Sequence, residues 1–133
     1  MTKEEHIKYW VETSEKDFQR AELLFREKDF VFALFCLHLV LEKMLKALWV
    51  NINFTEENYS PPRIHNLVRL SELSKLKLSE TDLVFLFDMN RFQLEGRYID
   101  YYGEVKKQCN LIFTEEKFSK TKTLISWLKE RLR

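Results

Sequence analysis

Three polar side chains interrupt the most apolar part of the sequence. His38, Glu42 and Lys46 stand four residues apart within residues 30–50, where Lys43 is the only other charged residue. Side chains at this spacing project from one face of a helix. They could form a polar seam whose members satisfy one another, at a helix end or at a subunit contact. They could instead line a cleft that binds a charged ligand.

A second candidate is His65, which follows Pro61 and Pro62 and precedes an apolar helical pattern. This places it at the first turn of a helix, where unpaired backbone N–H groups attract anions. A local cap or a packing contact is the other interpretation. The three histidines, at positions 6, 38 and 65, show no H-x-H or H-E-x-x-H spacing, so we expect no metal and no other cofactor.

The third candidate is the stretch 90–102, which brings two arginines and three tyrosines together around an expected helix end. Guanidinium groups supply charge for a phosphate, and phenol rings supply flat surfaces on which a base can stack. Arg97 and Tyr98 are the central residues of this pattern. Alternatively, Arg97 pairs with Glu95 or Asp100 and the tyrosines pack on the rest of the protein.

Composition limits the fold that can carry these groups. The chain has 133 residues, of which 45% are hydrophobic and 32% charged, so we expect a single domain over residues 1–133. Two glycines and two prolines are too few for the turns of an all-β protein. The net charge of +1 gives no general attraction to nucleic acid or anionic lipid, so we expect no DNA partner and a local phosphate site.

Apolar spacing of three and four predicts an all-α protein. Thr2 and Glu5 match a capping box, so the first helix begins almost at once and runs to about Lys28. Four more helices are expected. The second helix spans residues 30–50 after a cap at Asp29, and the third spans residues 64–76. The fourth begins at its cap Ser79 and ends at Gly96, and the fifth spans residues 114–132 and opens with Thr114. The result is a five-helix up-and-down bundle whose second helix is buried by the others.

The compartment follows from the cysteines and from hydropathy. Cys36 and Cys109 are the only cysteines and form no C-x-x-C pair, so neither a disulfide framework nor a zinc knuckle is indicated. The longest unbroken apolar run, residues 30–37, is far shorter than the ~18 to 20 residues of a membrane span. The charged start of the chain does not look like a signal peptide. We expect a cytoplasmic protein with no membrane partner.

Taken together, these segments resemble the HEPN family, small helical domains named for nucleotide binding in higher eukaryotes and prokaryotes. Residues 35–48 are similar to the family's central-helix pattern of a Glu, a Lys four residues later, and then Ala. His65-Asn66-Leu67 resembles its H-x-L, and residues 90–98 resemble its N-x-x-x-x-E-x-R-Y-P, with Ile99 in place of the proline.

The family's ribonucleases share an R-x(4–6)-H motif, which this chain lacks. Positions 102 to 104, counted from Arg97, are Tyr, Gly and Glu, and none of these replaces imidazole as an acid and base near neutral pH. The resemblance therefore implies a protein without conventional ribonuclease activity and with no catalytic residues. It would bind a nucleotide, or present a substrate, beside a separately encoded minimal nucleotidyltransferase in a toxin–antitoxin-like pair. The expected nucleotide- or phosphate-binding residues are Arg97, Tyr98, His38, Glu42, Lys46 and His65.

Two other functions stay open. The protein could be an RNA-cleaving HEPN toxin that uses Arg97 with His38 or His65, or a helical dimer that only scaffolds other proteins. In each case we expect a homodimer, because eleven Phe and three Trp are hard to hide in five short helices without an apolar patch that a partner covers.

Overall fold

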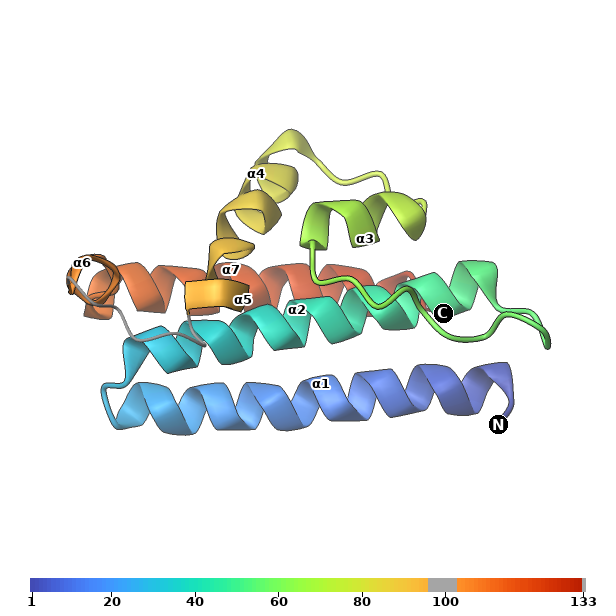
Figure 1. Ribbon diagram of the computed structural model, residues 1–133, viewed down its shortest axis with the longest axis horizontal. Helices are drawn as coiled ribbons and strands as arrows, with labels where there is room; N and C mark the ends of the chain where they lie inside the picture. The colour runs from blue at the N-terminus through green and yellow to red at the C-terminus, as the bar shows by residue number, and fades with distance from the viewer. Residues whose placement is uncertain (96–102, 133) are drawn as a thin grey trace.

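The computed structural model describes residues 1–95 and 103–132, and the described part is helical with no strand. Three long helices form the body, and four short ones lie along it (Figure 1). The long helices are α1 (Lys3–Arg26), α2 (Phe30–Asn53) and α7 (Leu111–Glu130). The short helices are α3 (Leu67–Leu73), α4 (Glu80–Met89), α5 (Arg91–Glu95) and α6 (Glu104–Gln108).

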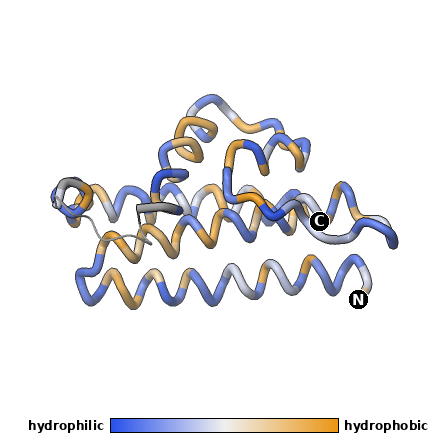
Figure 2. Tube along the Cα trace, viewed as in Figure 1, coloured by the Kyte–Doolittle hydropathy of each residue, from blue (hydrophilic) through white to orange (hydrophobic). Residues whose placement is uncertain are grey.

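Helix α2 is the centre of the bundle, as predicted. It packs against α1, α7, α3 and α5, and α1 runs antiparallel to it (Figure 1). Residues 54–95 carry the chain back along the long axis, so α7 runs in the direction of α2. Figure 2 shows apolar residues along the whole of α2. Its fully buried side chains make most of the core: Leu34, Leu37, Leu41, Met44, Leu45 and Leu48.

The first two helices begin close to the predicted positions. The capping box is confirmed, because the Glu5 amide donates to Thr2 Oγ1 and the Thr2 amide donates to the Glu5 carboxylate. Helix α1 ends at Arg26, before Lys28, whose φ of 62° leaves the helical region. Asp29 occupies the N-cap of α2, but its side chain makes no capping hydrogen bond.

Helix α2 extends three residues beyond the predicted end at Val50. Asn53 Nδ2 donates to the carbonyl oxygens of Trp49 and Leu73, at 3.2 and 3.0 Å. The last turn of α2 is thus joined to the end of α3. The contact between Asn53 and Leu73, which are 20 residues apart, favours helix at residues 51–53, where the local composition predicted a loop.

Asparagine caps shift two predicted helix starts. The third helix begins at Leu67 rather than at residue 64, because Asn66 Oδ1 accepts from the Arg69 amide at 3.1 Å. The last begins at Leu111 rather than at Thr114, because Asn110 Oδ1 accepts from the Phe113 amide at 2.9 Å. The Thr114 hydroxyl instead donates to the Asn110 carbonyl from inside the helix.

The fourth predicted helix is divided in two. Ser79 caps α4 as expected, since Ser79 Oγ accepts from the Asp82 amide at 3.1 Å. Helix α4 ends at Met89, however, and α5 begins beyond Asn90. Gly96, the predicted C-terminal cap, lies outside the described residues. The sequence between residues 97 and 113, for which no helix was predicted, contains the short helix α6.

Both cysteines are free and buried. Burial raises the pKa of the Cys36 thiol, and the nearby Asp17 carboxylate acts in the same direction. The thiol of Cys36 is therefore protonated and a poor nucleophile. Among the described helices, none is long and apolar enough to cross a membrane, and α2 carries three charged residues in its second half.

The position of α2 predicts where the stability of the fold lies. Replacing Leu41 by alanine removes a fully buried side chain and should lower the free energy of unfolding by ~2–5 kcal/mol. Leu23, which is half exposed on α1, gives the matched control, and Leu23→Ala should stay within ~0.5 kcal/mol. Urea denaturation at one protein concentration measures both, and equal losses would contradict the central position of α2.

Candidate functional site

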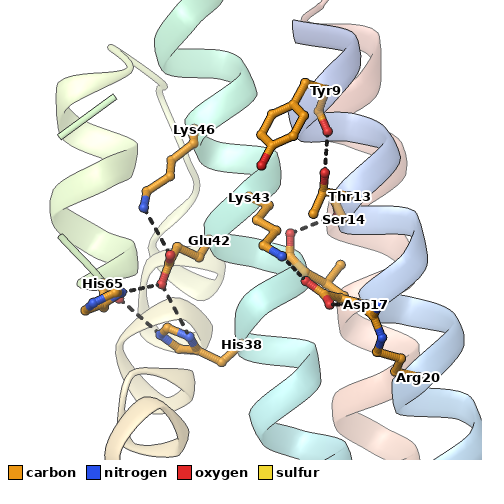
Figure 3. Close-up of polar contacts among 11 residues, drawn as sticks. Tyr9, Thr13, Ser14, Asp17, Arg20, His38, Glu42, Lys43, Lys46 and His65 are labelled. Atoms are coloured by element: carbon orange, nitrogen blue, oxygen red, sulfur yellow. Dashed lines mark hydrogen bonds and ion pairs between the residues drawn. The ribbon is translucent and has the colours of Figure 1, made fainter. Parts of the chain in front are cut away.

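The polar side chains of α2 meet His65 at a single carboxylate. Glu42 Oε2 accepts a hydrogen bond from Lys46 Nζ at 3.1 Å, and Glu42 Oε1 lies 2.8 Å from His65 Nδ1 (Figure 3). His38 Nε2 lies 3.0 Å from the backbone oxygen of His65. Four of the predicted site residues, from α2 and from the segment before α3, are thus in one cluster. We call His38, Glu42, Lys46 and His65 the Glu42 cluster.

The geometry assigns protons to both imidazole rings. Glu42 Oε1 and the His65 carbonyl are acceptors, so His65 Nδ1 and His38 Nε2 each carry a hydrogen. His38 Nδ1 then faces Glu42 Oε1 at 3.9 Å. In His65 the second nitrogen, Nε2, accepts a proton from an acid in neutral imidazole, or donates to a phosphate oxygen in imidazolium.

Burial separates the members of the Glu42 cluster. The side chain of His38 is fully buried, and those of Glu42 and Lys46 are 6% and 9% exposed. His65 differs, because 45% of its side chain is exposed. The Lys46 ammonium also lies 5.5 Å from the centre of the Trp10 ring. The three α2 residues therefore form the buried polar seam of the first interpretation, and within the Glu42 cluster only His65 presents its ring to solvent.

Two asparagines connect the Glu42 cluster to α5. Asn90 Oδ1 accepts from the Leu67 amide at 2.8 Å, and Asn90 Nδ2 donates to Asn66 Oδ1 at 3.2 Å. The start of α3, immediately after His65, is thereby attached to the junction between α4 and α5. Asn66 precedes an apolar helix start and so carries an N-cap signal, whereas no local pattern identifies Asn90 as its partner.

The remaining two predicted site residues, Arg97 and Tyr98, lie outside the described residues. They follow the end of α5 at Glu95 by two and three positions.

A second buried charged group was not predicted. Asp17 of α1 has a 4% exposed side chain and pairs with Lys43 of α2 at 2.5 Å and with Arg20 at 2.7 Å (Figure 3). Nearby, the Ser14 hydroxyl donates to the Val40 carbonyl. Only the Asp17–Arg20 spacing is visible as a helical pair in the sequence. These contacts lie on the other side of α2 from His65, where they hold α1 in place.

Among the described residues, no three His, Cys, Asp or Glu side chains are placed so that they could hold a metal ion together. What decides the family is a model of the HEPN domain, which matches residues 7–131. The chain belongs to the HEPN family. No curated protein and no solved structure matches it. In this HEPN chain the central-helix Glu and Lys form one cluster with the H-x-L histidine, which lies 23 residues after the Glu.

The buried carboxylate gives the first prediction for this site. Glu42→Ala should cost ~3–5 kcal/mol of unfolding free energy, because Lys46 would stay buried without its partner. The double variant Glu42→Met with Lys46→Met should recover most of the loss, because it removes both buried charges together. Glu72→Ala, which breaks the exposed Arg69–Glu72 pair, should cost at most ~1 kcal/mol. Chemical denaturation compares them, and similar costs at Glu42 and Glu72 would show that Glu42 is solvated.

Asn90 gives the second prediction. Asn90→Ala removes the acceptor of the Leu67 amide and should destabilise the start of α3 by ~1 kcal/mol. Amide hydrogen exchange should accelerate at Leu67 and the following turn of α3. Asn58→Ala, in the exposed loop after α2, is the control and should leave these amides unchanged. Unaltered exchange in Asn90→Ala would mean that α3 does not depend on this cap.

Proposed function

We propose that this HEPN protein binds a nucleotide and acts, as a homodimer, beside a separately encoded minimal nucleotidyltransferase, without cleaving RNA. The observation that carries the proposal is the anchored and half-exposed ring of His65, held by Glu42 at 2.8 Å. An imidazole fixed through one nitrogen presents the other in a constant direction, which suits recognition of a phosphate oxygen.

The neighbouring sequence supplies the other parts of a nucleotide site. Arg97 offers a planar fork of donors for a phosphate, and Tyr98 offers a ring for a base. The Asn90–Asn66 contact supports a site shared with His65, because it connects the residue after His65 to the start of α5. Glu42 and Lys46 act from beneath, as positioning residues for His65 rather than as ligands.

Burial argues against RNA cleavage through His38. A general base must reach the proton it removes, and the His38 side chain is fully buried with Nε2 directed at a carbonyl oxygen. Cleavage by Arg97 with His65 is the remaining form of that alternative. There the Glu42 contact would orient His65, but the chain has no second exposed histidine close to α3 to complete an acid and base pair.

Exposed apolar side chains support association with another chain. Phe87 of α4 is 70% exposed, and Leu111 and Ile112 of α7 are 49% and 76% exposed. Surfaces of this kind are commonly covered by a partner. In the proposed toxin–antitoxin-like pair, the homodimer would offer either a bound nucleotide or one of its own side chains to the nucleotidyltransferase.

The proposal is tested by nucleotide titration. Isothermal calorimetry with ATP and AMP should show binding that weakens at least ~10-fold in Arg97→Ala and in His65→Ala, a loss of ~1.4 kcal/mol. Arg69→Ala removes an exposed arginine of α3 and should bind as the wild type does. Absence of heat with every nucleotide would leave the scaffold function.

Incubation with RNA separates the enzyme from the binding protein. The wild-type protein should leave RNA intact. Cleavage that disappears in both Arg97→Ala and His65→Ala would replace the proposal with a ribonuclease. Sedimentation at micromolar concentration tests the homodimer, and a monomer there would contradict it.

A further inference from the structure

A lysine of α7 is buried without an anionic partner. Lys117 is only 9% exposed, and its ammonium lies 4.9 Å from the centre of the Phe113 ring and 5.9 Å from that of Phe85. Over the described ranges, no carboxylate or other hydrogen-bond acceptor lies within bonding distance of its Nζ. The buried Lys46 and Asp17, by contrast, each have a close partner of opposite charge.

An acceptor from outside the chain would complete this arrangement. Lys117 is only 9% exposed, so its ammonium has less water around it than that of a lysine on the surface. Contact with two aromatic rings replaces only part of the hydration that an ammonium loses. Lys117 thus has the environment of a binding group rather than that of a satisfied core residue.

Lys117 lines a hollow of about 330 Å³ between α4 and α7. One wall consists of Thr81, Val84, Phe85 and Asp88 of α4, and Lys120 stands near Lys117 on α7. Lys120 is already neutralised by Glu116 at 3.1 Å. The available positive charge in the hollow is therefore that of Lys117.

The first turn of α4 adds donors to the same hollow. Ser79 Oγ accepts a hydrogen bond from the Asp82 amide. The other amides in the first turn of a helix have no partner within the helix. Those of Glu80 and Thr81 belong to residues that line the hollow. The hollow thus combines the unpaired ammonium of Lys117 with the amide end of a helix, and both favour an anion.

Two carboxylates and two apolar side chains restrict which anion fits. Glu80 and Asp88 also line the hollow, so a ligand with several negative charges would be repelled. Val84 and Phe85 offer apolar surface to the rest of the ligand. We propose that the hollow between α4 and α7 binds the single carboxylate of a small apolar acid, with Lys117 as its ion partner. This site goes beyond the nucleotide site and shares no residue with it.

The test uses hexanoate as the probe, followed by the NMR signal of the Lys117 side-chain ammonium and by calorimetry. Hexanoate should bind to the wild type at least ~10-fold more tightly than to Lys117→Met, whose side chain still fits between the two rings. Lys8→Met removes an exposed lysine of α1 and should bind as the wild type does. Asp88→Asn should bind more tightly, because it removes a repulsive charge.

Each control can overturn the proposal. Equal binding of 1-hexanol would show that only apolar contact matters, and equal loss in Lys8→Met would show nonspecific attraction. No binding of hexanoate at millimolar concentration would remove the site. A blocked peptide with one Glu among leucines that binds while hexanoate does not would replace the small acid with a polypeptide. ATP binding should be the same in Lys117→Met, so failure here is distinguishable from failure of the nucleotide site.

Discussion

A carboxylate inside the central helix constrains everything around it. Glu42 is buried in α2, where an ionised carboxyl is stable only if hydrogen-bond donors replace the water it loses. Lys46 supplies one donor from the next turn of α2, and His65 supplies another from the segment before α3. The path of the chain between α2 and α3 therefore depends on Glu42.

The bundle uses buried charge on two sides of the same helix. Asp17, Lys43 and Arg20 join α1 to α2, and Glu42 joins α2 to the segment before α3. Leucines tolerate sliding of one helix along another, because apolar contacts are not directional. A hydrogen-bonded charge does not, since a shift of one turn would leave it unpaired and buried. The two polar groups consequently set the register of α1 and of α3 on a core that is otherwise uniform.

Local signals in the sequence predicted the local features of the fold. Thr2 with Glu5, and Ser79 with Asp82, are caps whose two halves lie three residues apart, and the structure has both. The last helix was placed too late because Asn110 and Thr114 are both capping residue types. Starting at Asn110 adds Phe113 to the helix, where its ring packs near Phe92, and only the tertiary structure shows that gain. The same limit applies to Asn90, whose side chain serves the Leu67 amide of another helix.

The sequence also predicted one face of α2 for His38, Glu42 and Lys46, but spacing does not tell a buried seam from an open cleft. That distinction depends on what covers the face. Here the segment ending in His65 covers the face, and the backbone oxygen of His65 also accepts a hydrogen bond from His38 Nε2.

The same geometry defines what each histidine of the Glu42 cluster can do. His38 is fully buried and its Nε2 is directed at the His65 carbonyl oxygen, so this ring does not reach a substrate. His65 is held by Glu42 through Nδ1, which fixes the direction of Nε2 on a half-exposed ring. A carboxylate on one imidazole nitrogen also orients a general base in enzymes, so this contact suits phosphate recognition and proton transfer alike. Breaking a phosphodiester requires a second group that exchanges protons, and the other members of the Glu42 cluster are buried. The choice between binding and cleavage therefore depends on a group outside the Glu42 cluster.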